Sequence, residues 1–399
     1  MNLSGSAQVK SYRLTAIDAL RGLVMIIMAL DHTREMFHFA AYTSDPVDMA
    51  TTTPALFMTR WITHFCAPVF VFLSGTSIYL QSLRKTKKEL SAYLLKRGLW
   101  LILVDVVIMT FAITFDIHYG ILILQVIWAI GISMVLLSGL IRLPFSLVAT
   151  IGLLIVFGHN LLDYLEKVPP ERIPFIVHAL HRPTILPIGA GHSLGALYPF
   201  LPWTGVMLIG YAFGKIYSSK PDAHAQARLA QMTGLVGVAI FIILRCINKY
   251  GDPTPWSAQK TPVYTLLSFL NTQKYPPSLM YLCMTLGPAL LLLSVIDRVP
   301  AKIVSMMNVY GRVPFFYYIL HFYILHLATA IVFLGRGHSF RQGIDGSPPF
   351  PFHFIVPGEG VSLPAVYAIW IVVVSALYPL CRWFGEYKRD HRQWWLGYV

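Results

Sequence analysis

Long apolar stretches alternate with short polar segments along most of the chain. A helix that crosses the hydrocarbon core of a bilayer needs about 20 mainly apolar residues at a rise of about 1.5 Å each. The pattern therefore predicts an all-α membrane protein whose single domain, residues 1–399, is a bundle of about ten transmembrane helices. The predicted spans lie near residues 14–35, 60–82, 93–115, 119–139, 145–164, 197–217, 229–248, 276–297, 309–334 and 364–385.

The connections between these spans differ greatly in length. The third and fourth spans are joined only by the sequence DIHY, residues 116–119, which predicts a tight helical hairpin. Two other connections, residues 166–196 and 335–362, are long and rich in glycine, proline, aromatic residues and histidine. Long loops of this kind are usually functional or disordered. The aromatic residues favour a packed cover over the outer mouth of the bundle.

Composition and charge support the membrane class. Hydrophobic residues make up 56% of the chain and charged residues 12%, whereas a soluble domain carries roughly 25% charged residues. The net charge of +13 does not indicate nucleic-acid binding, because the basic residues cluster between apolar runs. With the N-terminus inside, the inner segments hold more lysine and arginine than the longer outer segments. The positive-inside rule therefore predicts that both termini are cytoplasmic.

Several common motifs are missing from the sequence. The four cysteines, Cys66, Cys246, Cys283 and Cys381, stand singly in or beside apolar segments, so neither a metal site nor a disulfide framework is predicted. Nucleotide-binding and zinc-protease motifs do not stand out. The first apolar run is interrupted by Arg21 and lacks a signal-peptide cleavage site, so we expect it to be retained as the first span.

The first predicted span carries unusual charge, with Asp18, Arg21, Asp31 and His32 in one apolar stretch. An ionisable residue at the bilayer centre costs about 2.5–3.5 kcal/mol on insertion scales and usually marks a pathway or a reaction site. Arg21 and His32 are close to three helical turns apart, so they share one face at a separation of about 16 Å along the axis. Asp18 lies one turn before Arg21 and can pair with it. The plainer alternative is that Arg21 reaches the inner headgroups while His32 caps the outer end.

The spacing R-x10-H on a first span resembles the membrane acyltransferases that modify cell-surface sugars. Five blocks more closely resemble the bacterial relatives of heparan-α-glucosaminide N-acetyltransferase: IDALRGLVMIIMALDH, HFCAPVFVFLSGTSIYL, LQVIWAIGISMVLL, PWTGVMLIGYAFGKIY and GRVPFFYYILHFYILH. These blocks fall on the first, second, fourth, sixth and ninth spans, so the resemblance covers most of the chain. The first block is the most specific.

The resemblance implies an acetyl-CoA-dependent transferase in a bacterial-type cytoplasmic (inner) membrane. Acetyl-CoA is the expected co-substrate, and the acceptor is an amine or hydroxyl of a sugar or glycan beyond the membrane. Arg21 is suited to the donor because a guanidinium makes planar, bidentate contacts with phosphates. His32 is suited to act as general base, or to carry the acetyl group transiently. The family pattern has asparagine at the position of His32 and a working histidine slightly later, so His38 competes for the same role.

Further candidates lie on other spans. His321 falls in the GRVPFFYYILHFYILH block, although a histidine among aromatic residues is often a neutral core group; Tyr318, one turn earlier, can orient it. Gln125 on the fourth predicted span is an amide that needs hydrogen-bond partners, either the donor or a neighbouring helix. The remaining candidates are Arg312 for the donor, with Asp31 and His64 as supporting residues toward the outer surface.

A transporter for an anionic or sugar-linked solute is the rival interpretation, because it would use the same buried charges. Transporters of this kind often have internal repeats and helices broken near the midplane. No convincing repeat is found, and Pro68, Pro199, Pro202 and Pro314 lie near the beginnings of spans. The enzyme interpretation is therefore favoured. It leaves open the acceptor, N- or O-acetylation, direct or two-step transfer, and whether the protein forms a homo-oligomer.

Overall fold

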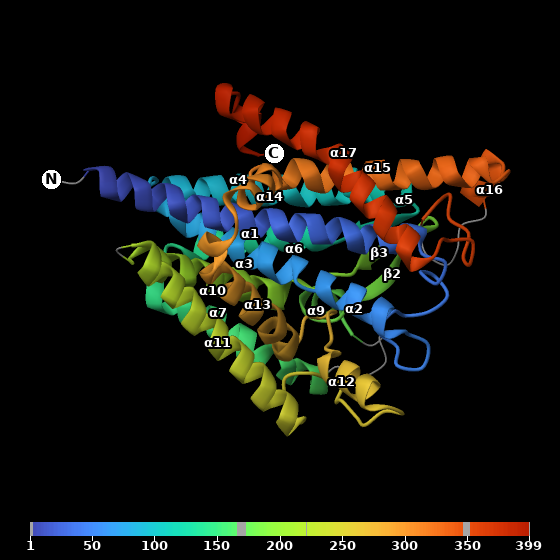
Figure 1. The fold of residues 1–399 in the computed structure, drawn as a ribbon, viewed down its shortest axis with the longest axis horizontal. Coiled ribbons are helices and arrows are strands. Elements are labelled where there is room, and N and C mark those ends of the chain that lie inside the picture. The colour runs from blue at the N-terminus through green and yellow to red at the C-terminus, as the bar shows by residue number, and fades with distance from the viewer. Residues whose placement is uncertain (1–2, 166–172, 221, 346–351, 399) are drawn as a thin grey trace.

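The computed structural model describes residues 3–165, 173–220, 222–345 and 352–398. It is 71% helical, and its long helices form an elongated bundle (Figure 1). The larger helices are α1 (Leu3–Phe37), α2 (Pro54–Thr63), α3 (Cys66–Ser82), α4 (Lys87–Val104), α6 (Val126–Leu140), α7 (Phe145–Gly158), α10 (Phe200–Ser218), α11 (Ala223–Ile247), α13 (Leu279–Ser294), α14 (Ala301–Gly311), α15 (Pro314–Gly335) and α17 (Leu363–Asp390).

The predicted membrane class is confirmed. Within the described residues, six helical stretches are long and apolar enough to cross a membrane. They are Pro54–Ser82, Lys87–Thr114, Phe145–Tyr164, Ala223–Ile247, Pro314–Gly335 and Leu363–Asp390. Each of the ten segments predicted as spans overlaps a helix of the structure, including α1, α6, α10 and α13.

The tight hairpin predicted around DIHY is wrong. Helix α4 continues through the π-helical turn η1 (Asp105–Met109) into α5 (Thr110–Thr114), and Phe115 then adopts a left-handed conformation that ends the helix. The side chain of Asp116 accepts the backbone N–H groups of His118 at 2.8 Å and Gly120 at 2.7 Å. This turn leads into a strand, β1 (Ile121–Leu124), and α6 begins only at Val126. Helices α4 and α6 still pack side by side.

The long segment around residues 166–196 has structure of its own in its described part. It forms α9 (Phe175–Leu180) and a hairpin of β2 (Thr184–Gly189) and β3 (His192–Ala196). Strand β3 lies in the centre of a three-stranded sheet, parallel to β1 and antiparallel to β2. Residues 166–172 of this segment lie outside the described residues.

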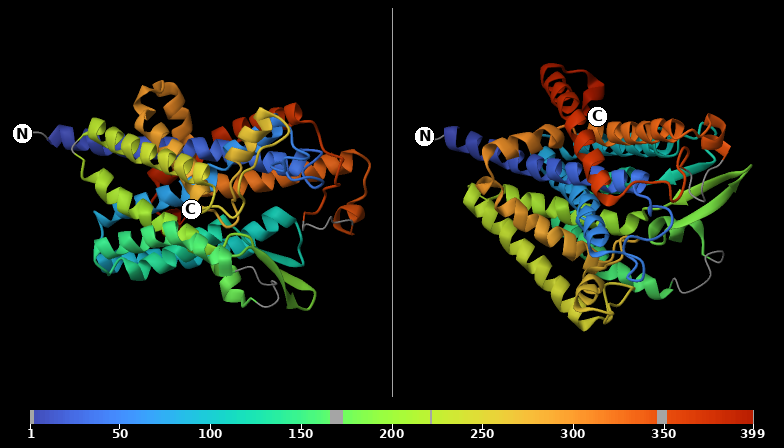
Figure 2. Two further views of the ribbon diagram at one scale, coloured as in Figure 1. Left: turned by 90° about the horizontal axis from the view of Figure 1, so that it is seen from below. Right: turned by 45° about the vertical axis from the view of Figure 1, so that its right-hand side comes forward.

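The second long segment, around residues 335–362, contains α16 (Phe340–Asp345), and its residues 346–351 lie outside the described residues. Figures 1 and 2 show α16 and the β2–β3 hairpin at the same end of the bundle, opposite the N-terminus. Helix α12 (Pro262–Leu270) contacts α2 and lies at the lower edge of the bundle in Figure 1. The hairpin and α16, which are far apart in sequence, therefore lie at the same end of the bundle.

Helix α1 lies inside the bundle and contacts α2, α3, α13, α14, α15 and α17. Its closest neighbour is α14, and glycines make that approach feasible. A methyl group at Gly22 would overlap the backbone carbonyl of Met307, and one at Gly311 would overlap the carbonyl of Asp18. Backbone atoms cannot move aside as a flexible side chain can. Small residues at such contacts let membrane helices approach closely.

We expect Gly22→Ala to destabilise the protein by about 1–3 kcal/mol, the usual effect of overpacking a tight core. The added methyl would push α1 away from α14. Gly139→Ala is the matched control, because nothing lies within 4 Å of a methyl group there. Alanine is the better helix former by roughly 0.5–1 kcal/mol, so this control should melt at or above the wild-type temperature. Equal melting temperatures for both variants in detergent would contradict the assigned contact.

Candidate active site

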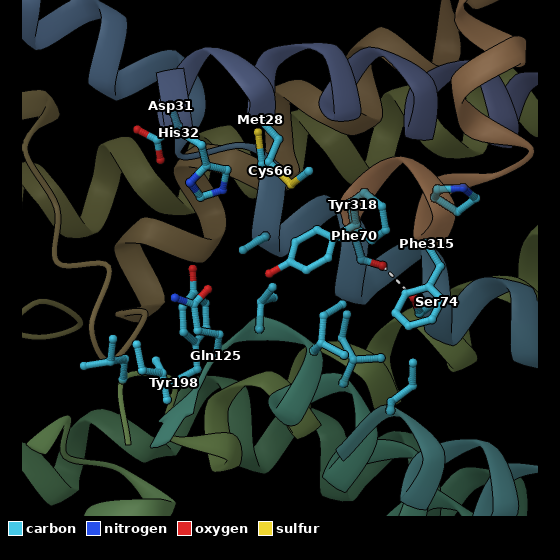
Figure 3. A pocket seen from close by; sticks show the side chains of 18 of the residues that line it. Met28, Asp31, His32, Cys66, Phe70, Ser74, Gln125, Tyr198, Phe315 and Tyr318 are labelled. Atoms are coloured by element: carbon cyan, nitrogen blue, oxygen red, sulfur yellow. Dashed lines mark hydrogen bonds between the residues drawn. The ribbon is translucent and has the colours of Figure 1, made fainter. Parts of the chain in front are cut away.

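A cavity of about 750 Å³ extends between α1, α3, α4, α6 and α15. Arg21 and His32 of α1 both line it, about three helical turns apart. Between them the wall is mainly apolar and aromatic, as seen close up in Figure 3. The apolar residues of the lining include Met28, Phe70, Ile127, Ile130, Met134 and Phe315. One continuous cavity therefore joins the two residues.

The guanidinium of Arg21 is fixed by neighbours on three helices. It donates to the carboxylate of Asp18 at 2.8 Å, to the hydroxyl of Ser77 on α3 at 2.8 Å, and to the carbonyl of Gly311 at 3.3 Å. The expected pairing with Asp18 is present. Asp18 compensates the charge of Arg21. Arg21 is therefore suited to offer a hydrogen-bond donor at a fixed position in this end of the cavity, and adds little net charge.

Additional positive charge surrounds the Arg21 end of the cavity. Arg97 of α4, Arg312 at the end of α14 and Lys388 of α17 all line it. Arg97 also donates to the backbone carbonyl of Gly397, in the short C-terminal turn η5 (Trp394–Gly397). The Arg21–Asp18 pair carries no net charge, so these three cations give this end of the cavity a net positive charge. It is therefore suited to an anionic group.

The imidazole of His32 contacts a carboxylate one turn further along the same helix. Its Nδ1 lies 3.1 Å from Oε2 of Glu35. A carboxylate in this position holds the ring proton on Nδ1, which leaves Nε2 as a hydrogen-bond acceptor. His32 lines the cavity and is 18% exposed. The pair has the arrangement of a general base held in one tautomer by a carboxylate.

Asp31, next to His32, belongs to a network of charges. Its carboxylate is buried and lies 3.2 Å from the guanidinium of Arg34, 3.8 Å from Nζ of Lys274, and in direct contact with Arg60. Arg60 comes from α2, and Lys274 precedes α13. The contacts of Asp31 with Arg60 and Lys274 thus hold the end of α1 against these two segments. Asp31 also lines the cavity.

His321 lies behind His32. The two ring centres are 5.3 Å apart, and Phe322 packs against His32 at 4.2 Å. His321 is fully buried, and its Nδ1 lies 3.1 Å from the carbonyl of Tyr317. Tyr318 packs edge-on against His321 at 5.7 Å, and its hydroxyl has no hydrogen-bond partner among the described residues. His321 therefore supports the ring of His32 from behind.

The other two candidate histidines lie away from the cavity lining in the described part of the chain. His38 follows the end of α1, where its Nδ1 accepts the N–H of Ala40 at 3.3 Å and its backbone pairs with Val361. Burial, with the nearby charge of Arg34, lowers the pKa of His38. His64 is buried with its ring 5.4 Å from that of Tyr281.

Gln125 occupies a different local structure from the one predicted. It stands in the turn between β1 and α6, and its backbone N–H donates to Oδ2 of Asp105 at 2.7 Å. The fully buried Asp105 thus holds the turn in place. The side chain of Gln125 lines the cavity, on the wall across from His32 (Figure 3).

Several residues of this cavity were missed by sequence reasoning, and the charged ones include Glu35, Arg97, Lys274 and Lys388. Glu35 had a signal, because it follows His32 by three positions and must lie one turn away on a helix. The other three come from segments remote in sequence, and helical periodicity carries no information about such neighbours.

No group of three or more histidine, cysteine, aspartate or glutamate residues able to hold a metal occurs in the described residues.

Residues 13–244 match the protein-family model described as "Heparan-alpha-glucosaminide N-acetyltransferase, catalytic". The match covers more than half of the 399 residues and contains Arg21, His32, Glu35, Arg97 and Gln125. A comparison with curated proteins finds no match. Helices α15 and α17, which complete the cavity, lie beyond the matched range.

Proposed function

This chain belongs to the heparan-alpha-glucosaminide N-acetyltransferase family, and we propose that it transfers acetyl groups across a membrane. In this proposal cytoplasmic acetyl-CoA is the donor, and an amine or hydroxyl of a sugar or glycan on the far side is the acceptor. The observation that carries the proposal is the cavity lined by both Arg21 and His32. The same helix thus offers a cation toward one substrate and a base toward the other.

The Arg21 end of the cavity is suited to the donor. Coenzyme A carries its negative charge on phosphates at one end of a flexible pantetheine arm. Arg97, Arg312 and Lys388 supply positive charge around this end of the cavity. Arg21 is already oriented by Asp18 and Ser77, and can receive the first polar group of the arm. The apolar middle of the cavity suits the arm itself, so that the thioester reaches His32.

In the proposed reaction, Nε2 of His32 accepts the proton of the acceptor as its nitrogen or oxygen attacks the thioester carbon. The imidazolium that forms is stabilised by the carboxylate of Glu35 at Nδ1. When the tetrahedral intermediate collapses, the carbon–sulfur bond breaks and the thiolate of CoA takes the proton back from His32. In the two-step alternative, Nε2 attacks the thioester, and the carbon–sulfur bond breaks with release of the CoA thiolate. The acceptor then attacks the acetyl-imidazole, the nitrogen–carbon bond breaks, and the acceptor's proton passes to the thiolate.

We place both termini and the Arg21 end on the cytoplasmic side of a bacterial-type inner membrane, with ten spans in a single domain. The distribution of basic residues supports this orientation. The two long segments would then lie on the far side, covering the acceptor. Pro183 and Ile185 from the first segment and Phe352 from the second line the cavity, which supports their assignment as a cover.

One experiment tests both the chemistry and its direction. Purified protein is reconstituted into vesicles, acetyl-labelled acetyl-CoA is added outside, and either glucosamine or N-acetylglucosamine is enclosed. We expect CoA release outside and labelled sugar inside, from the fraction of molecules whose donor end faces outward. Labelling of glucosamine alone indicates an amine acceptor, and labelling of both sugars indicates a hydroxyl.

Two outcomes would contradict the proposal. If label reaches neither sugar and no CoA is released, the transferase is rejected. If an unmodified sugar instead crosses the membrane without acetyl-CoA, the transporter interpretation replaces it. Vesicles without protein provide the background for both measurements.

A further inference from the structure

Tyr318 of α15 has a hydroxyl group with no hydrogen-bond partner among the described residues, although the residue is only 3% exposed. Leaving a buried hydroxyl unpaired costs about 1–3 kcal/mol. Tyr318 lines the cavity, and in Figure 3 it lies on the wall between His32 and Phe315. An unpaired hydroxyl on a cavity-lining residue is suited to a hydrogen bond with a bound ligand.

The preceding residue provides an internal comparison. Tyr317 is also buried, and its hydroxyl also lacks a partner in the described part of the chain. Its ring, however, packs against Tyr310 at 5.4 Å and His321 at 5.5 Å, and it does not line the cavity. The two tyrosines therefore share burial and an unpaired hydroxyl, but of the two only Tyr318 lines the cavity.

Tyr318 and His32 rest on the same pair of rings. Phe322 lies 5.4 Å from the ring of Tyr318 and 4.2 Å from that of His32. His321 lies 5.7 Å from Tyr318 and 5.3 Å from His32. The phenol and the imidazole thus pack against the same two rings. Both residues line the cavity.

We propose that the hydroxyl of Tyr318 is a catalytic hydrogen-bond donor to the carbonyl oxygen of the thioester. This inference rests on the proposed acetyl transfer. When the acceptor forms its bond to the carbonyl carbon, the π electron pair of the carbonyl moves onto oxygen. Tyr318 donates its O–H to that oxyanion while His32 holds the acceptor's proton. Collapse restores the carbonyl, the carbon–sulfur bond breaks, and the thiolate receives the proton from His32.

A donor of this kind acts more strongly on the transition state than on the bound substrate, because negative charge develops on the oxygen only during the reaction. Removing one such donor typically lowers kcat by about 10²–10³-fold. The effect on donor binding should be small, because a thioester carbonyl is a weak acceptor. The proposed role therefore predicts a change in kcat that is separate from any change in KM.

The test compares Tyr318→Phe with Tyr317→Phe in purified, reconstituted protein. Acetyl-CoA is varied at a fixed concentration of whichever probe sugar, glucosamine or N-acetylglucosamine, the wild type acetylates. We expect Tyr318→Phe to lower kcat by about 10²–10³-fold and to change the KM for acetyl-CoA by less than about twofold. Tyr317→Phe should retain the wild-type kcat. Both variants should melt at or above the wild-type temperature, because phenylalanine preserves the packing of each ring and removes an unpaired buried hydroxyl.

Three outcomes would overturn the inference. One is a kcat for Tyr318→Phe within about threefold of wild type. Another is a raised KM with unchanged kcat, which would assign the hydroxyl to binding the pantetheine arm. The third is an equal loss in Tyr317→Phe, which would indicate a general packing effect. Failure of the wild type itself to transfer acetyl groups is a different result, because it rejects the proposed function together with this inference.

Discussion

Replacing His32 by alanine is expected to lower acetyl transfer by about 10²–10⁴-fold, the usual contribution of a general base. His32 is the candidate histidine that lines the cavity and also contacts a carboxylate, that of Glu35. The side chain is partly exposed to the cavity, so its removal should leave the fold intact. The measurement is kcat for transfer to the probe sugar, together with acetyl-CoA binding by calorimetry, which should be nearly unchanged.

His38→Ala is the matched control for this variant. His38 lies beyond the end of α1 and outside the cavity lining, so its loss should leave kcat close to the wild-type value. Glu35→Gln should lower kcat less than His32→Ala does, because the imidazole remains while its charged partner is lost. Full activity of His32→Ala, combined with an inactive His38→Ala, would transfer the role of base to His38.

Replacing Arg21 by alanine should have two separable effects. The donor loses an oriented guanidinium, and a charge-assisted hydrogen bond contributes about 1.5–3 kcal/mol. By the relation of roughly 1.4 kcal/mol per factor of ten, the KM for acetyl-CoA should rise on the order of 10–100-fold. The protein should also be less stable, because the carboxylate of Asp18, 23% exposed, loses its partner at 2.8 Å.

The double variant Asp18→Asn with Arg21→Ala separates these effects. Removing the unpaired carboxylate should restore much of the melting temperature. It should not restore the KM for acetyl-CoA, because the guanidinium is still missing. A wild-type KM in the single variant would dismiss the donor role of Arg21. Recovery of both quantities in the double variant would reduce that role to structural support.

The helical part of the fold could be predicted from the sequence because a bilayer imposes a strong constraint. Backbone polar groups in hydrocarbon must be paired internally, so long apolar stretches become helices. The prediction failed at residues 119–125, where a short apolar run forms β1 instead of the start of α6. Hydrophobicity alone cannot separate a short strand from a helical turn. The partner strand β3 lies about 70 residues further along the chain.

The site was predictable only where one helix determines the geometry. Helical periodicity brought Asp18 to Arg21 and aligned Arg21 with His32, and these neighbours are present on α1. Periodicity could not show that Lys388 or Arg97 would reach the same cavity, because that depends on how α17 and α4 pack. Nor could it show which of the two adjacent tyrosines on α15 faces the cavity. Those facts depend on tertiary structure.

The unbroken course of α1 from Leu3 to Phe37 has a consequence for how the acetyl group travels. Arg21 and His32 are fixed points on one stiff rod, about three turns apart. A rocking motion of that rod would move the two residues together, and their separation would stay constant. In the proposed transfer, the distance between the two residues is therefore bridged by the flexible thioester arm of the donor, and not by a movement of α1.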